Sequence, residues 1–219
     1  MKKLIVTIVA LSLFVSVASV FAQTPVTGLV GKGVKVGLNM AKFTGSDAKA
    51  MGDQKMKMGL AVGGYITYAF SDLFAVQPEL YYTMKGSKFE NDVDFNGTLV
   101  HVKYTGKYNY IEIPILAKVM LSGTPTFKPN FYAGPGLGFL MSAKVKGEAE
   151  GQSAETDVKD DSKSMDLGLI GGVGADYAMG THKLTFDLRY EAGLSKIGDG
   201  SDAGKVYNSA ISFLVGFGF

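Results

Sequence analysis

Apolar side chains recur at every second position in eight separate segments of this chain. In the segment 183–194, Leu184 and Phe186 lie on one face, and Asp187 and Arg189 lie on the other. A period of two predicts β-strands with one apolar and one polar face. The other segments span about 34–40, 57–68, 74–84, 108–120, 131–142, 165–177 and 207–219. Because an even number of antiparallel strands can close with both termini at one end, we expect an all-β, eight-stranded antiparallel up-and-down barrel.

The connections between these segments differ in length. Those after the second, fourth and sixth segments are short, whereas the others are long and hydrophilic. The short ones span 69–72, 121–129 and 179–182, and the long ones span 42–55, 86–107, 144–164 and 195–205. Transmembrane barrels have short periplasmic turns and long extracellular loops. The pattern therefore predicts a transmembrane β-barrel, with its third long loop solvated and mobile.

Glycine indicates which face of the strands meets lipid. Alternation alone fits either a soluble barrel with an apolar interior or a membrane barrel with a polar one. Many of the 29 glycines fall on the polar face: Gly134, Gly136, Gly138, Gly168, Gly172, Gly174, Gly216 and Gly218. Nothing on a solvated outer surface requires them, whereas the interior of an eight-stranded barrel has just enough room for side chains. The polar face is therefore predicted to line the lumen.

The first residues have the features of a secretory signal. Two lysines precede an apolar core at 4–17 that is too short to span a bilayer, and small or compact residues follow at 20–22. We expect cleavage after Ala22, which makes 1–22 a signal peptide and 23–219 an outer-membrane β-barrel domain. The predicted location is the cell outer membrane of a Gram-negative bacterium.

Charge and cysteine content exclude several kinds of partner and site. Cleavage would remove two of the 22 basic residues and none of the 20 acidic ones, which leaves 20 of each in the mature chain. A formally neutral chain has no general attraction for nucleic acid. Because the chain has no cysteine, disulfides, thiolate metal sites and a lipidated N-terminal cysteine are excluded.

Two segments resemble a known family. Residues 110–118 read YIEIPILAK and residues 131–138 read FYAGPGLG. They are similar to the YxEIPxLxK and YAGPxxG stretches of the PorT-like outer-membrane β-barrel family (porin family) of Bacteroidota. The resemblance implies a barrel along the whole mature chain, and for some members a component of a protein secretion system, but no catalytic residues. The final run containing Phe217 and Phe219 also resembles the terminal aromatic signal that the barrel-assembly machinery recognises.

Five charged residues lie well inside the predicted strands on the lumen face: Glu79, Glu112, Asp187, Arg189 and Glu191. Such charges need partners, since an unpaired buried charge is costly. Arg189 is the only arginine, and we expect it to reach across toward Glu79 and Glu112 and to plug the lumen. The alternatives are a proton or cation path and acid/base catalysis by paired carboxylates. A structural network is preferred because eight-stranded barrels rarely leave an aqueous channel.

The sequence gives only weak support for a metal site, a hydrolase or a phosphate-binding loop. His101 and His182 are the only histidines, and they fall in an external loop and a periplasmic turn, so they cannot readily share a metal ion. Ser87 could partner His101 in a hydrolase, but an ordinary loop histidine is the simpler interpretation. The glycines at 171–174 lack the helix and the Lys-Ser/Thr ending of a phosphate loop. We therefore predict no catalytic, cofactor-binding or metal-binding residues.

These observations predict a non-enzymatic protein that acts through its external loops, stabilises the membrane or belongs to an export assembly. A small solute pore or transporter is one alternative, and a lipid-modifying barrel enzyme is another. The expected partners are outer-membrane lipid, the barrel-assembly machinery and an envelope protein at the loops, without nucleic acid.

Overall fold

The computed structural model describes residues 27–95, 98–149, 151–200 and 204–219. The predicted signal peptide and its cleavage site lie outside these residues. The barrel strands are β1 (Gly28–Thr44), β2 (Lys55–Ala69), β3 (Phe74–Phe95), β4 (Thr98–Met120), β5 (Phe127–Ala149), β7 (Met165–Met179), β8 (His182–Gly193) and β9 (Tyr207–Gly218). A short helix, α2 (Ser46–Ala50), and a short strand, β6 (Gln152–Asp157), lie in the connections.

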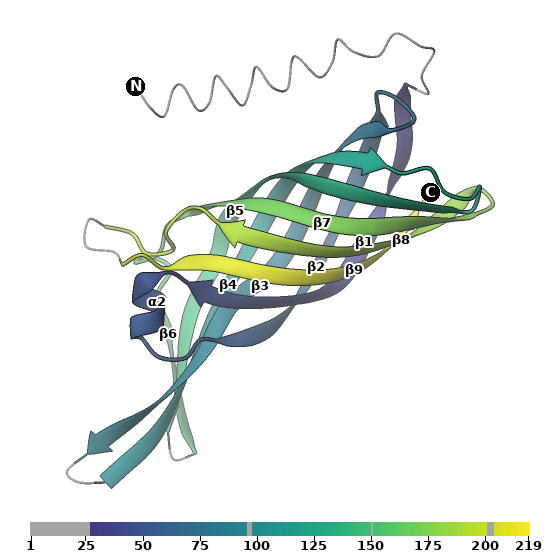
Figure 1. The fold of residues 1–219 in the computed structure, drawn as a ribbon. Coiled ribbons are helices and arrows are strands. Elements are labelled where there is room, and N and C mark those ends of the chain that lie inside the picture. Colours follow the sequence, from purple (N-terminus) through teal and green to yellow (C-terminus); the bar gives the residue numbers. More distant parts are fainter. Residues whose placement is uncertain (1–26, 96–97, 150, 201–203) are drawn as a thin grey trace, which may run out of the picture.

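The barrel strands close into a ring of antiparallel neighbours. Their order is β1-β2-β3-β4-β5-β7-β8-β9, and β9 pairs back with β1 from Gly33↔Gly218 to Thr44↔Tyr207. Figure 1 shows these strands tilted around a common axis. This closure confirms the predicted eight-stranded up-and-down barrel.

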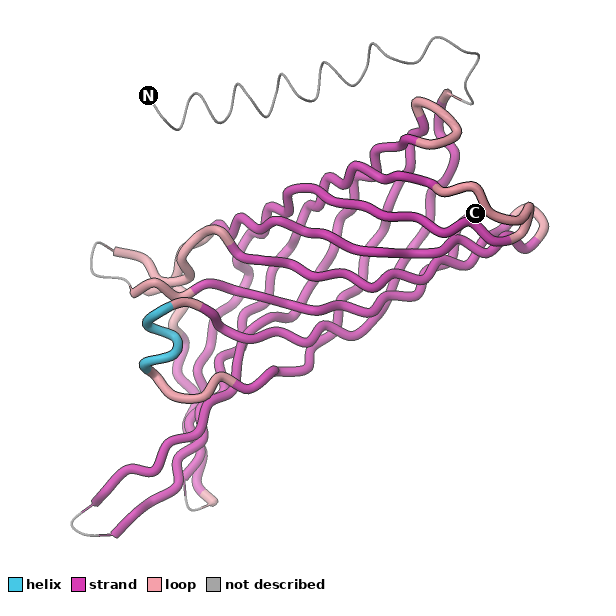
Figure 2. The backbone as a smooth tube through the Cα atoms, in the orientation of Figure 1, coloured by secondary structure: helices cyan, strands magenta, loops and turns pink. Residues whose placement is uncertain are grey.

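The two ends of the barrel carry different connections. The turns at 70–73, 121–126 and 180–181 lie at the end that holds the C-terminus, whereas α2 and β6 lie at the opposite end (Figures 1 and 2). Short turns and long connections are thus segregated, as their lengths predicted. The end with α2 and β6 is called the external end below.

Two of the long connections are not loops over much of their length. β3 and β4 continue as a paired hairpin across most of 86–107, and β5 runs on to pair with β6 inside 144–164. The expectation of long loops there was wrong over the paired residues, because strand pairing continues beyond the membrane-facing part of the barrel. Phe89 and Tyr104, for example, stack with ring centroids 5.0 Å apart. The external end therefore carries an extended sheet.

Side-chain burial identifies the lumen face. Lys35 and Arg189 are 2% and 6% exposed, whereas their neighbours Val36 and Leu188 are 55% and 50% exposed. A water-soluble barrel would show the reverse. Polar side chains therefore line the interior, and the outward apolar surface suits acyl chains. Among the described residues, no helix has the length and apolarity needed to cross a membrane.

Candidate functional site

Glu79 is the centre of a group of four charges that crosses the lumen. Arg189 on β8 donates from Nη1 to Glu79 Oε2 at 2.7 Å and from Nη2 to Glu79 Oε1 at 3.3 Å. Lys35 Nζ on β1 lies 3.0 Å from Glu79 Oε1 and 2.6 Å from Asp187 Oδ2. We call these four residues the Glu79 cluster. Because β3 and β8 lie on opposite sides of the ring, the cluster joins the two walls.

A second group lies beside the first. Lys85 Nζ on β3 is 2.5 Å from Glu191 Oε1 and 3.4 Å from Glu112 Oε2. We call Lys85, Glu112 and Glu191 the Glu191 cluster. Glu112 therefore pairs with Lys85, whereas the sequence had placed Arg189 between Glu79 and Glu112. All three side chains are less than 10% exposed, so the pairs are shielded from water.

Sequence reasoning missed Lys35 and Lys85, which bridge the carboxylates in the two clusters. Lys35 carried a usable signal, since it stands on the polar face of the first alternating segment. Lys85 directly follows the predicted end of the third segment at 84, and its place inside the barrel depends on the extension of β3 to Phe95. Both lysines are at most 2% exposed, so each depends on its carboxylate partners.

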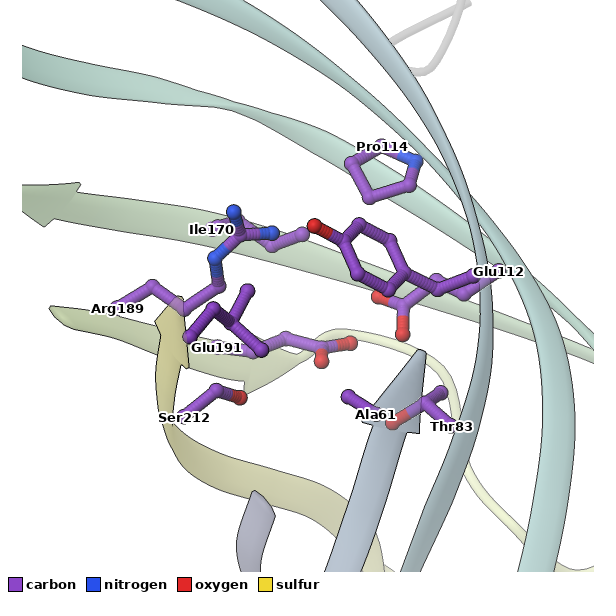
Figure 3. Close-up of a pocket in the computed structure, with 10 residues that line it drawn as sticks. Ala61, Thr83, Glu112, Pro114, Ile170, Arg189, Glu191 and Ser212 are labelled. Carbon is purple, nitrogen blue, oxygen red and sulfur yellow. The ribbon is translucent and has the colours of Figure 1, made fainter. Parts of the chain in front are cut away.

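A small cavity separates the two clusters. It measures about 20 Å³ and is lined by Arg189, Glu112 and Glu191 together with apolar and hydroxyl side chains, which is room for about one water molecule. Figure 3 shows these three side chains converging, Glu112 from β4 and both Arg189 and Glu191 from β8. Arg189 Nε and Glu112 Oε1 are buried here without a hydrogen-bond partner among the described residues. The cavity thus offers both a donor and an acceptor to a bound water.

Aromatic rings and glycines shape the space around the clusters. The Arg189 guanidinium lies 5.5 Å from the Tyr81 ring centroid and 5.4 Å from that of Tyr132, within the range of cation–π attraction. A Cβ added at Gly168 would lie 2.6 Å from Glu191 Oε1, and one at Gly174 would lie 2.7 Å from Asp187 Oδ1. Glycine at these two positions makes room for the charged side chains.

Polar contacts continue toward both ends of the lumen. At the end with the short turns, Asp176 Oδ2 lies 3.1 Å from Lys183 Nζ, and Asp176 Oδ1 lies 3.4 Å from Lys118 Nζ. At the external end, Asn208 donates to Asp166 at 2.7 Å. Side chains therefore fill the barrel at several levels, and the two central clusters carry most of its buried charge.

The remaining candidate residues do not assemble into a reactive group. Ser87 donates its hydroxyl to Gln54 Oε1 at 2.8 Å, and His101 Nδ1 lies 2.7 Å from Asp92 Oδ1 in the external hairpin. Ser87 is therefore engaged with Gln54, and no hydrogen bond between Ser87 and His101 is found among the described residues, although His101 has the acidic partner that a triad histidine needs. His182 lies in the turn region at the other end, with its ring 5.1 Å from the Phe217 ring. In the described ranges, no three His, Cys, Asp or Glu residues gather as a metal site requires.

Other predicted positions lie on the barrel wall. The glycines at 171–174 are inside β7, where strand pairing continues on both sides. Phe217 and Phe219 are 41% and 56% exposed on the outward face. Phe219 N donates to Lys32 O at 3.0 Å, so the final residue is still paired with β1.

Several solved structures are similar to this chain. Neisserial surface protein A is 18% identical over 88% of this chain and 99% of that chain, with a TM-score of 0.45. Ail, the attachment invasion locus protein of Yersinia pestis, is 14% identical over 88% and 97%, with a TM-score of 0.40. OprG from Pseudomonas aeruginosa is 17% identical over 88% and 96%, with a TM-score of 0.37. No curated protein sequence matches the chain.

A family model covers most of the sequence. It is described as the outer membrane protein beta-barrel domain, and it matches residues 21–199. This match agrees with the closed ring of strands and with the outward apolar face. The chain therefore belongs to the outer membrane protein beta-barrel domain family and is an outer-membrane β-barrel protein.

Proposed function

We propose that this protein is a closed, non-enzymatic barrel that makes contacts at the cell surface through the sheet at its external end. The observation that carries the proposal is the ion pairing across the lumen. Arg189 and Glu79 join β8 to β3, and Lys85 joins β3 to Glu191 on β8. Both links cross the centre of the barrel, where a solute path would have to run. Opening them would leave charges buried without partners, which is unfavourable.

The external sheet supports a contact role. It consists of the distal parts of β3, β4 and β5 together with β6, and its hairpin projects beyond the barrel (Figure 1). All six residues of β6 are exposed, and Leu99 near the β3–β4 tip is 73% exposed. β6 pairs only with β5, so one edge of the sheet is open. An open edge and an exposed apolar tip are features to which another chain can bind.

Charge pairs join side chains of β4, β5 and β6 in the external sheet. Lys107 Nζ and Lys144 Nζ lie 2.5 Å and 3.2 Å from the Glu155 carboxylate. Hydrogen bonds from these two ammonium groups lower the pKa of Glu155 below its usual value. The carboxylate therefore stays ionised at any pH above the ordinary titration range of Glu.

Conductance in planar bilayers tests the closed lumen. The wild-type mature protein is expected to give no steady openings, and Arg189→Ala is expected to give openings because it removes one of the two links across the barrel. A matched control is Lys128→Ala, since Lys128 is exposed on β5. Steady conductance by the wild-type protein would overturn the proposal and favour the pore.

Site-specific photocrosslinking in cells tests the contact role. A crosslinking side chain at Leu99 is expected to form an adduct with an envelope protein, and one at Thr124, which is exposed in a turn at the other end, is not. Equal labelling from the two positions would contradict a role for the external sheet. An altered lipid A profile in a deletion strain would instead favour the lipid-modifying enzyme.

Three narrower assignments belong to the same proposal. Cleavage after Ala22, membership of the PorT-like group and a place in an export assembly are supported by the sequence features given above. The N-terminal sequence of the protein purified from outer membranes tests the first. Co-purification with secretion components in intact cells tests the third.

A further inference from the structure

A groove of about 440 Å³ opens on the outward face of the barrel, toward the end with the short turns. Ile66, Leu80 and Phe219 line it, and all three side chains are exposed on the outward face. The volume is within the usual range of small-molecule sites, about 300–1,000 Å³. Because the outward face contacts the membrane, the groove is accessible to lipid. We call it the Ile66 groove.

The Ile66 groove exists because one outward position has no side chain. Gly64 pairs with Val34 on β1 and with Leu80 on β3, and both of these neighbours face outward. Residues paired across a sheet share a face, so Gly64 faces outward as well. A Cβ added at Gly64 would meet only Gly33 O, at 3.4 Å. A larger residue at position 64 would therefore fill the groove without striking the strands beside it.

Strand pairing is interrupted inside the Ile66 groove. β2 and β3 are paired on both sides of Ile66 and Pro78 in one unchanged register, but not at these two residues. In that register Pro78 stands opposite Ile66, and proline has no backbone N–H to donate. Both residues line the groove, so the interruption lies in its wall.

The register also shows which way the Ile66 carbonyl points. Phe219 N donates to Lys32 O at 3.0 Å, so the backbone polar groups of Lys32 point toward β9. Lys32 stands opposite Ile66, and in an antiparallel sheet hydrogen-bonded and non-bonded pairs alternate across each strand. The backbone polar groups of Ile66 therefore point away from β1 and toward β3. There the Ile66 carbonyl meets Pro78, which cannot supply the hydrogen that it would accept.

Two other prolines interrupt strand pairing in the same way. Pro114 does so between β3 and β4, and Pro135 between β4 and β5, but neither proline lines the Ile66 groove. A backbone acceptor without a donor is unfavourable in the hydrocarbon region of a membrane. At Ile66 the groove gives a lipid access to such an acceptor. A lipid that carries a hydrogen-bond donor is therefore favoured there over one that carries none.

We propose that the Ile66 groove binds a lipid with an amide-linked acyl chain, whose amide N–H donates to the Ile66 carbonyl. An ester-linked chain fills the same space but has no hydrogen to donate. Lys32 and Phe219 also line the groove, with Lys32 Nζ 5.5 Å from the Phe219 ring centroid. Lysine and aromatic side chains are typical of the membrane interface, which is where headgroups are linked to acyl chains. This inference is independent of the proposed contact role of the external sheet.

Native mass spectrometry of the full mature barrel, in an amine-oxide detergent that has no hydrogen-bond donor, tests the proposal. The probes are sphingomyelin and phosphatidylcholine, which share a headgroup but differ in amide and ester linkage. One hydrogen bond contributes roughly fivefold in binding, so the wild-type barrel is expected to prefer sphingomyelin by about that factor. Sphingomyelin with a methylated amide nitrogen keeps its hydroxyl but loses the N–H. It is expected to bind like phosphatidylcholine.

Three variants locate the effect, and heat-modifiable migration on gels reports whether each one folds. Pro78→Ala supplies an N–H to the Ile66 carbonyl and is expected to abolish the preference for sphingomyelin. Pro135→Ala makes the same change away from the groove and is expected to retain that preference. Gly64→Leu fills the groove and is expected to weaken the binding of both lipids. Equal affinity of the wild-type barrel for the two lipids, which needs no variant, would overturn the proposal, as would a preference that survives Pro78→Ala or is lost in Pro135→Ala.

Discussion

The replacement Glu79→Gln tests how strongly the charges in the lumen stabilise the barrel. The Glu79 side chain is fully buried and receives Arg189 at 2.7 Å and Lys35 at 3.0 Å. Glutamine keeps the size and shape of the side chain but removes its charge, which leaves two cations with only Asp187. Breaking a buried ion pair by removing one partner typically costs about 3–5 kcal/mol, and we expect the free energy of unfolding to fall by about that amount.

Urea titration of the refolded barrel in lipid vesicles, followed by heat-modifiable migration, measures this change. The control Glu90→Gln removes the same charge from an ion pair of similar length, Lys55–Glu90 at 2.5 Å, whose side chains are 56% and 29% exposed. Water and salt screen that pair, so little change is expected. If uncompensated charge is the cause, adding Lys35→Met to Glu79→Gln should recover part of the stability. Equal effects of the two single replacements would refute the reasoning.

Three further predictions use the same unfolding assay or limited proteolysis. Gly172→Ala would bring a Cβ to 2.7 Å from an aromatic ring in the lumen, whereas Gly171→Ala meets nothing within 4 Å; the first should destabilise by about 1–3 kcal/mol and the second should not. Lys85→Met leaves two buried carboxylates together and should lower the free energy of unfolding by about 3–5 kcal/mol. A variant as stable as wild type would contradict this prediction. Tyr104→Ala removes the stack on Phe89 and should speed proteolysis of the external hairpin. The urea concentration at the midpoint of barrel unfolding should stay unchanged.

The barrel could be predicted because its strands follow a local rule. One face of each strand contacts acyl chains along the membrane-facing part, so apolar residues recur at every second position. In β8 they alternate with charged residues such as Asp187 and Arg189, and the period of two is still visible. The external sheet could not be predicted in the same way. Its segments are rich in charged residues, and the pairing of β4 with the distal part of β5 joins residues as far apart in the sequence as Val102 and Ala149.

β5 illustrates a second limit. Its pairing with β4 shifts between Asn109↔Ser142 and Tyr110↔Leu140, so β5 carries an extra residue at this point. Leu140 and Ala143 are both buried as a result, although a strict period of two would place them on opposite faces. An irregularity of this kind changes which side chains enter the lumen, and the sequence gives no local signal for it.

The charged side chains of the site were predictable by type and face, but their partners were not. Glu79 and Arg189 stand on the polar faces of two segments that lie opposite each other in an eight-stranded ring, which is enough to expect contact. Whether Glu112 reaches Arg189 or Lys85 depends on the stagger of neighbouring strands. That stagger is set by many backbone hydrogen bonds together, and no single segment reveals it.

The position of the lumen charges also bears on how the strands find their register. A slip of one residue would turn Glu79 toward lipid, which the apolar face already opposes. A slip of two residues keeps every side chain on its own face but moves it along the strand by about 7 Å, and acyl chains cannot distinguish the two arrangements. The ion pair between Arg189 and Glu79 does distinguish the two registers. In the slipped register its 2.7 Å contact would be lost, and two buried charges would be left apart. The polar interior therefore selects one register among those that the lipid-facing side chains permit.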